Sequence, residues 1–135
     1  MVLRFLISSE EKIWFDHVGC YRDKGPKAWK RPELRAIKHL YLNNRGKIPS
    51  WDNFKDVVMA CAQGAQAKGC PCFGVQFYGE CWCDPLACET YDIYKDSQKC
   101  FKGVGLQWTN YVYKGKCGSG KGGHKTWFSI NSVVR

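Results

Sequence analysis

The sequence predicts a small, disulfide-rich domain of the α+β class, with one main helix and a few short strands. Three observations support this prediction: one long segment has apolar residues at helical spacing, shorter segments around it are rich in aromatic and β-branched residues, and nine of the 135 residues are cysteines. Hydrophobic residues make up 44% of the chain, which is enough to bury a core. The 14 glycines and nine cysteines indicate a loop-rich scaffold that needs covalent cross-links.

The first element expected is a strand over residues 13–21, because this stretch is aromatic and β-branched. The turn-forming sequence RDKGP at residues 22–26 ends it. A short helix is expected over residues 32–40, since it begins with a proline, which is tolerated at a first helical position. The sequence NNRG at residues 43–46 then breaks the chain.

The clearest element is a helix over residues 51–68. Ser50 stands at the cap position and Asp52 in the first turn, where the helix dipole favours an anion. Gly69 is the expected terminator. Because Cys61 lies on the apolar face, we expect it to point at the core. The residues at helical spacing on that face are Phe54, Val57, Val58, Cys61, Ala62 and Ala65.

Two strands follow the helix. Residues 73–78 alternate, which predicts a half-buried strand that turns at residues 79–80. Residues 108–113 form the second strand, and the glycine- and lysine-rich sequence after it predicts a flexible tail. In the first strand we expect Phe73, Val75 and Phe77 to fill the inner face, which leaves Gln76 and Tyr78 on the other. The expected division is an N-terminal extension at 1–12, a module at 13–114 and a tail at 115–135.

The net charge of +9 is unevenly distributed. Residues 1–21 carry −1, residues 22–47 carry +7, residues 48–100 carry −3, and residues 101–135 carry +6 without any acidic residue. Basic surface is therefore expected before the main helix and in the C-terminal tail. Such patches suit polyanions such as sulfated glycans or acidic cell surfaces, although solvated charge that serves only solubility is the alternative.

The cysteine content favours an oxidising compartment, so we expect an extracellular or cell-surface protein. Residues 1–12 lose their apolar character after Ile7, which leaves no visible cleavable signal, and no run is long enough to cross a bilayer. The chain is then either a fragment of a longer secreted protein or the product of a gene model without its first exon. The cysteine content argues against the third alternative, a cytosolic protein.

Several motifs follow one another in a distinctive order along residues 17–114. VGCYRD begins at Val18, the helix with Cys61 follows, CFGVQFYGECWC spans residues 72–83, and WTNYVY spans residues 108–113. This order resembles that of the WSC-like modules of extracellular and cell-surface proteins, which are related to PAN/apple domains. The resemblance implies a fold in which the helix packs across a few-stranded antiparallel sheet, and it implies binding, usually of carbohydrate, rather than catalysis.

The chain departs from the WSC pattern at its cysteines. WSC domains carry a second helix cysteine four residues after the first, where this chain has Ala65. The disulfide map of the family is therefore not transferred whole. The cysteines that are placed differently are Cys70, Cys72, Cys88 and Cys117.

Disulfides are the favoured role of the cysteines, with zinc binding and reduced buried thiols as alternatives. A zinc site would use the Cys70-x-Cys72 and Cys81-x-Cys83 pairs, but structural zinc prefers pairs separated by two to four residues. A C-x-x-C redox motif is absent from the sequence. We therefore expect neither a metal nor another cofactor.

Two bridges follow from the placement of the cysteines. Cys61 on the inner helix face and Cys81 just after the central strand would join helix to sheet, and Cys20 near the first strand and Cys100 near the last would join the ends. Five cysteines remain, so at least one is free or pairs outside the chain. Cys117 in the tail is the candidate, with a bridge to Cys70 or Cys72 as the alternative.

The aromatic residues around the hairpin that contains Cys81 are the best indication of a ligand site. Sugar recognition needs flat rings that stack on C–H faces, together with amide and carboxylate groups that bind hydroxyls. For each ring, ordinary packing in the core is the alternative. The candidate ligand-binding residues are Gln76, Tyr78, Glu80, Trp82, Tyr94, Trp108 and Asn110.

Enzymatic, nucleotide and nucleic-acid motifs are weak. His17, His39 and His124 have no evident nucleophile or metal partner in the sequence. The GKCGSGKGG stretch that begins at Gly115 has Gly122 where a phosphate-binding loop needs serine or threonine. Nucleic-acid binding would depend on charge alone, so neither it nor catalysis is expected.

The sequence therefore supports two main hypotheses. The first is a non-catalytic extracellular module that binds carbohydrate or glycoprotein, including acidic glycans through its basic segments. The second is a structural or adhesive module of the matrix or cell surface that acts through those basic patches.

Overall fold

The computed structural model describes residues 15–48 and 51–115. These residues form a five-stranded sheet and a separate two-stranded hairpin, together with two α-helices and three short 3-10 helices. The strands are β1 (Phe15–Arg22), β2 (His39–Asn43), β3 (Cys72–Gln76), β4 (Glu80–Cys83), β5 (Cys100–Phe101), β6 (Val104–Gly105) and β7 (Thr109–Gly115). The helices are η1 (Pro26–Trp29), η2 (Pro32–Leu34), η3 (Arg45–Lys47), α1 (Lys55–Lys68) and α2 (Ala87–Thr90).

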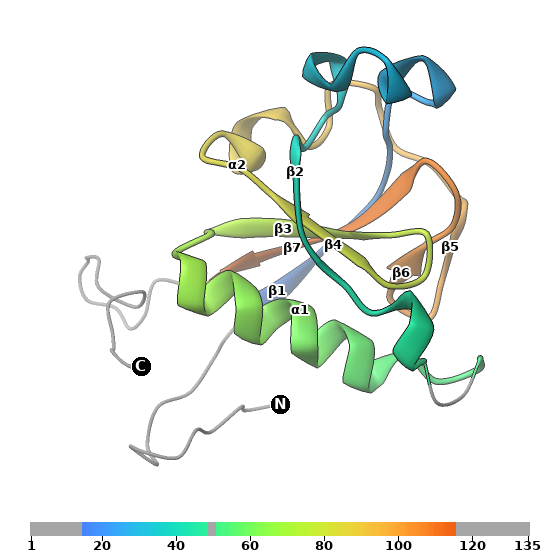
Figure 1. Cartoon of the computed structure of the whole chain (residues 1–135), viewed down its shortest axis with the longest axis vertical. Coiled ribbons are helices and arrows are strands. Elements are labelled where there is room, and N and C mark those ends of the chain that lie inside the picture. The colour runs from blue at the N-terminus through green and yellow to red at the C-terminus, as the bar shows by residue number, and fades with distance from the viewer. Residues whose placement is uncertain (1–14, 49–50, 116–135) are drawn as a thin grey trace.

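The main sheet is antiparallel throughout and has the strand order β1-β7-β3-β4-β2. α1 packs against one face, and α2 lies with η1 and η2 on the other (Figure 1). All five residues of β3 are buried, because this central strand is covered on both sides. The predicted fold, a disulfide-rich α+β domain with one main helix across an antiparallel sheet, is confirmed.

The main helix is shorter than predicted at its N-terminus. It begins at Lys55 instead of residue 51, and the side chain of Asn53 accepts a hydrogen bond of 3.0 Å from the Lys55 amide. The predicted cap Ser50 lies outside the described residues, and Asp52 precedes the helix. The predicted terminator is correct, because Gly69 adopts the left-handed conformation with a φ of 75°.

The helix predicted over residues 32–40 does not form. Pro32–Leu34 makes one 3-10 turn, and His39–Asn43 becomes the edge strand β2. This strand pairs with β4, and Tyr41 on it donates a hydrogen bond of 2.7 Å to the Cys61 carbonyl oxygen. Burial raises the pKa of Tyr41, so its hydroxyl stays protonated. Tertiary pairing therefore overrides the local preference of the segment.

The alternation predicted for residues 73–78 ends at Gln76. Phe77 and Tyr78 both adopt left-handed backbone conformations, with φ angles of 51° and 72°. Phe77 consequently lies beside Gln76 on the face opposite α1, whereas Tyr78 packs against Phe54 on the α1 side. The assignment of Phe77 to the inner face and Tyr78 to the outer face was wrong, because alternation requires an extended backbone.

Four disulfides join the elements. Two are the bridges expected from cysteine placement: Cys20–Cys100 with a Cα–Cα distance of 6.1 Å, and Cys61–Cys81 with 5.4 Å. The other two are Cys70–Cys83 and Cys72–Cys88. Every cysteine in the described part of the chain is therefore paired, and Cys117 lies outside it.

Gly74 on β3 leaves space for a buried side chain from the neighbouring strand. A Cβ atom at this position would lie 2.6 Å from Asn110 Oδ1 and 2.8 Å from Asn110 Cγ. Asn110 is fully buried, and its Oδ1 accepts a hydrogen bond of 3.2 Å from Gln76 Nε2. The Asn110 side chain therefore cannot move aside without loss of this bond.

We expect the double variant Cys61→Ala/Cys81→Ala to lose about 3 kcal/mol of unfolding free energy, because the bridge closes a loop with a sequence separation of 20. Guanidinium titration followed by circular dichroism measures this loss. A chelator added to the oxidised wild-type protein should leave the transition unchanged. If chelator shifts the midpoint of the unfolding transition and the double substitution does not, the structural role of the bridge is contradicted.

The substitution Gly74→Ala should lower the unfolding free energy by about 1–3 kcal/mol, since it forces a methyl group into the Asn110 side chain. The matched control is Gly46→Ala, because a Cβ at Gly46 meets no atom within 4 Å. We expect that control to change stability by no more than about 0.5 kcal/mol. Equal effects of the two substitutions in thermal or denaturant unfolding would argue against close packing at Gly74.

Candidate binding site

A small pocket of about 130 Å³ lies on the sheet face opposite α1. Strands β3 and β4 form its floor, and the segments around η1, η2 and the start of β7 form its walls. We call it the tryptophan pocket. It is lined by Trp29, Arg35, Gln76, Phe77, Glu80, Trp82, Gln107 and Trp108.

The centre of the tryptophan pocket is the guanidinium group of Arg35. Its carbon lies 4.0 Å from the ring centroid of Trp82 and 4.8 Å from that of Trp108. Arg35 Nη1 donates a hydrogen bond of 2.7 Å to Asp23 Oδ2. Two aromatic rings and one carboxylate therefore hold the cation in a single orientation at the lining of the pocket.

Asp23 holds Arg35 and Gln76 of the pocket in position through hydrogen bonds. Its side chain is fully buried, and it accepts hydrogen bonds from Arg35, from the Ala36 amide at 2.8 Å and from Gln76 Nε2 at 3.2 Å. Gln76 Nε2 also donates to Asn110 Oδ1 at 3.2 Å. Both amide hydrogens of Gln76 are thus used inside the protein, which leaves its carbonyl oxygen as the remaining polar atom of this side chain at the pocket.

Trp82 is part of the floor and does not present an exposed ring. It is only 8% exposed, and its Nε1 donates a hydrogen bond of 3.1 Å to Glu80 Oε1. The prediction that Trp82 offers a free stacking face was therefore wrong. The segment from Asp23 to Arg35 folds over the ring, and nothing in the local sequence around Trp82 indicates this cover.

The exposed ring at the pocket is that of Trp29, which the sequence-based site did not include. Trp29 is 76% exposed, and its ring centroid lies 5.7 Å from that of Trp108 at an interplanar angle of 53°. A signal was present in the sequence: Trp29 is the single aromatic residue in the basic stretch KAWKR. Because most of this ring is exposed among cations, it contributes little to the core, which favours a role in recognition.

Two bulky residues of the pocket have unusual backbone conformations. Phe77 and Trp108 adopt φ angles of 51° and 52°, in the left-handed region that side-chain-bearing residues rarely occupy. Main-chain hydrogen bonds hold both: Phe77 N donates to the Leu106 carbonyl at 3.1 Å, and the Trp108 carbonyl accepts from Asp23 N at 2.9 Å. Such strain gathers at functional sites, which supports this pocket as the candidate.

The structure brings together some of the predicted ligand residues and separates the others. Gln76, Glu80, Trp82 and Trp108 line the tryptophan pocket. Asn110 is completely buried and supports Gln76, so it does not meet a ligand directly. The Tyr94 hydroxyl donates to the Leu34 carbonyl at 2.6 Å and holds η2, while Tyr78 packs against Trp51 on the opposite face. Asn110, Tyr94 and Tyr78, which were also predicted to bind the ligand, therefore do not line the tryptophan pocket.

A basic hollow of about 550 Å³ adjoins the tryptophan pocket, and Trp29 lines both. Glu33 lies beside the hollow and accepts a hydrogen bond of 2.6 Å from Arg31 Nε, which lowers the pKa of that carboxyl group. Among the described residues, four cations and no acid line the hollow itself, so its charge is positive. It is lined by Lys24, Pro26, Lys27, Trp29, Lys30, Arg31 and Leu34.

Within residues 15–48 and 51–115, no group of three His, Cys, Asp or Glu side chains is arranged to hold a metal ion. None of the helices described is both long and apolar enough to cross a membrane. The four disulfides are typical of proteins that fold in an oxidising compartment.

Comparisons with protein-family models, with curated proteins and with solved structures found no significant match. The resemblance to WSC-like modules therefore stays a prediction from the sequence motifs.

Proposed function

We propose that this domain is a non-catalytic, extracellular carbohydrate-binding module whose site is the tryptophan pocket together with the exposed ring of Trp29. The observation that carries the proposal is the position of this ring, 76% exposed at the rim of a pocket that contains polar groups held in fixed orientations. The four disulfides support an extracellular location.

The polar groups of the pocket suit a sugar. The ring of Trp29 offers an apolar face for the C–H groups of a pyranose, and Trp108 stands beside it. The Glu80 carboxylate and the Gln76 carbonyl accept hydrogen bonds from hydroxyl groups, while Arg35 donates them. This mixture of flat ring, acceptors and donors is the one that sugar recognition requires.

The size of the pocket limits the affinity. At about 130 Å³ it is smaller than the roughly 300–1,000 Å³ of pockets that enclose a small molecule. Only one edge of a sugar enters it, and the rest of the ligand lies on Trp29 and the adjacent loop. A shallow site of this kind gains little beyond the entropy lost on association, so weak, repeated binding to a glycan chain is expected.

The neighbouring basic hollow favours acidic glycans over neutral ones. Lys27, Lys30 and Arg31 surround the same ring that stacks on the sugar, so a sulfate or carboxylate on the next residue of the glycan meets positive charge. The ligand class proposed is therefore a polymer of sugars that carries acidic groups.

A structural or adhesive module is the second candidate, and it is favoured by the same cluster of cations. In that case the domain would attach to acidic surfaces by charge alone, without a contribution from the tryptophan pocket. The four bridges use eight of the nine cysteines, which leaves Cys117 for a bridge to another chain.

Trp29→Ala should weaken glycan binding at least tenfold and leave the unfolding free energy within about 0.5 kcal/mol of wild type, because the ring is mostly exposed. A glycan array identifies the ligands, and isothermal titration measures their affinity. The matched control is Trp51→Ala, which removes another exposed tryptophan that packs against Tyr78 on the opposite face. If both variants bind as wild type does, the site proposed here is wrong.

Replacement of two cations by Lys27→Gln/Lys30→Gln should weaken binding of sulfated glycans several-fold and leave neutral glycans unaffected. The effect should shrink as salt increases, because ionic screening acts over roughly 10 Å at 0.1 M salt. Lys68→Gln/Lys99→Gln is the control of equal charge, since these lysines lie outside the basic hollow. Binding that disappears entirely at high salt and does not depend on Trp29 would favour the adhesive module.

A further inference from the structure

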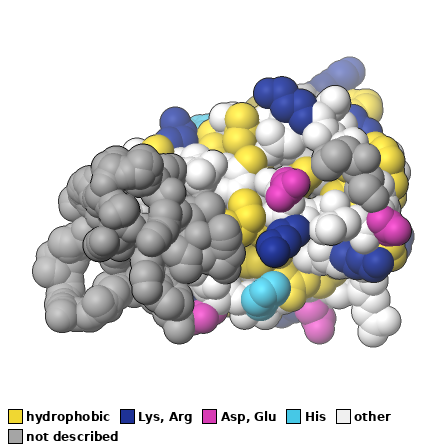
Figure 2. Space-filling view, turned by 90° about the horizontal axis from the view of Figure 1, so that it is seen from below, with side chains coloured by type: hydrophobic (Ala, Val, Ile, Leu, Met, Phe, Trp, Pro, Cys, Tyr) yellow, Lys and Arg dark blue, Asp and Glu magenta, His cyan; other side chains and the backbone are white. Residues whose placement is uncertain are grey.

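A larger groove lies on the other face of the sheet, beside α1. The helix packs over β2, β4 and β3. The groove lies between α1 and the part of the sheet formed by β7 and β1. Tyr113 and Phe15 form its floor. The groove has a volume of about 570 Å³ and is separate from the tryptophan pocket, with which it shares no residue. Figure 2, which views the molecule from the α1 side, shows hydrophobic side chains at this surface interspersed with charged ones.

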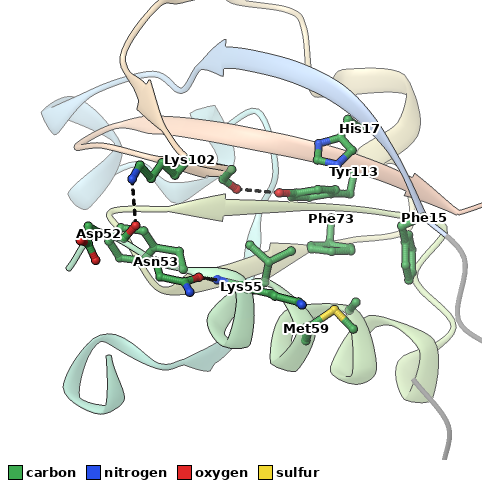
Figure 3. Close-up of a pocket in the computed structure, with 13 residues that line it drawn as sticks. Phe15, His17, Asp52, Asn53, Lys55, Met59, Phe73, Lys102 and Tyr113 are labelled. Atoms are coloured by element: carbon green, nitrogen blue, oxygen red, sulfur yellow. Dashed lines mark hydrogen bonds between the residues drawn. The ribbon is translucent and has the colours of Figure 1, made fainter. Parts of the chain in front are cut away.

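The interior of the groove is apolar and already ordered. Phe73 and Tyr113 stack with ring centroids 5.1 Å apart and an interplanar angle of 18°, and Phe15 meets Phe73 edge-on at 4.9 Å. Val58 and Met59 of α1 form the facing wall. Figure 3 shows Phe15, Phe73 and Tyr113 on the sheet side and Met59 on the helix side of the same cavity. Flat rings opposite aliphatic side chains make a slot for an apolar chain or ring system.

Cationic groups stand at the rim. Lys102 and Lys55 both line the groove. Among the described residues of its lining, Asp52 is the one acidic residue. Lys102 Nζ donates a hydrogen bond of 3.0 Å to the Asp52 main-chain carbonyl, which keeps the amine at the opening and leaves it two further N–H donors (Figure 3). The Tyr113 hydroxyl donates to the Gly103 carbonyl at 2.8 Å, so it is not available to bind an anion.

Burial raises the pKa of Tyr113, so its ring contributes no negative charge to the groove. His17 lies above the same ring at a centroid distance of 5.1 Å and adds a further nitrogen at the rim. The groove thus combines an apolar interior with a rim on which lysines outnumber carboxylates.

We infer that this groove binds a small amphipathic anion, with an apolar chain or ring inserted between Phe15 and Met59, above the buried ring of Phe73, and one carboxylate or sulfate group at the lysines. Its volume falls within the range of pockets that enclose such molecules, roughly 300–1,000 Å³. We expect the head group of the ligand to be negatively charged, because Lys55 and Lys102 attract an anion and repel a cation. The inference does not depend on the proposed glycan site, because the two surfaces lie on opposite faces of the sheet.

The test compares three ligands with one eight-carbon chain and different head groups: octanoate, 1-octanol and octylammonium. Isothermal titration of the full, disulfide-intact chain should show octanoate as the tightest and octylammonium as the weakest. Lys55→Gln/Lys102→Gln should weaken octanoate about fivefold and leave octanol unchanged, since each exposed charge contact contributes little. The control of equal charge is Lys68→Gln/Lys99→Gln, which should bind all three ligands as wild type does.

A second pair of variants tests the location. Met59→Trp should fill the groove and abolish octanoate binding, whereas Gln63→Trp on the exposed side of the same helix should not. Absence of octanoate binding by the full chain overturns the inference. Equal affinity for the three head groups overturns the anionic class, and undiminished binding by Met59→Trp overturns the position.

Discussion

The buried carboxylate of Asp23 holds together the layer on which the candidate binding site depends. It lies just after β1 and binds Arg35, the Ala36 amide and Gln76 of β3. Burial of an isolated carboxylate would cost several kcal/mol, and these partners offset that cost. The loop from η1 to β2 therefore folds back over Trp82, and the pocket is the space left where the loop meets the sheet.

The same interaction fixes the orientation of the side chains that line the pocket. Arg35 is fixed on one side by Asp23 and on its faces by two tryptophan rings. The left-handed conformations of Phe77 and Trp108 are each costly by about 1–3 kcal/mol, so they persist only where the surrounding structure enforces them. A site whose groups are already in place loses less entropy when a ligand binds, which matters most for a shallow site.

The two faces of the sheet offer different chemistry. The α1 face has an apolar groove with lysines at its rim, while the opposite face has a polar pocket, an exposed tryptophan and a basic loop. β3 separates them and is buried on both sides. Disulfides anchor both layers to this central part of the sheet: Cys61–Cys81 and Cys70–Cys83 on the α1 side, and Cys72–Cys88 on the other. The two candidate sites therefore share no described residue.

The sequence by itself determined the elements whose signals are local. The helix that ends at Gly69, the central strand and the α+β class follow from periodicity and from a glycine that can adopt a left-handed conformation. The bridges Cys20–Cys100 and Cys61–Cys81 follow from the order of these elements. Of the predicted ligand residues, Gln76, Glu80, Trp82 and Trp108 line one pocket, whereas Tyr78, Tyr94 and Asn110 do not.

Only the tertiary structure decided what depends on contacts between distant segments. Residues 39–43 form a strand because they pair with the edge of β4. Tyr78 lies on the α1 face of the sheet, and not on the opposite face, because Phe77 and Tyr78 both adopt left-handed conformations. The burial of Trp82 and the exposure of Trp29 depend on the hydrogen bond from Arg35 to Asp23, twelve residues apart along the chain. Periodicity describes which residues share a face of one element, but it contains no information about which loop covers that face.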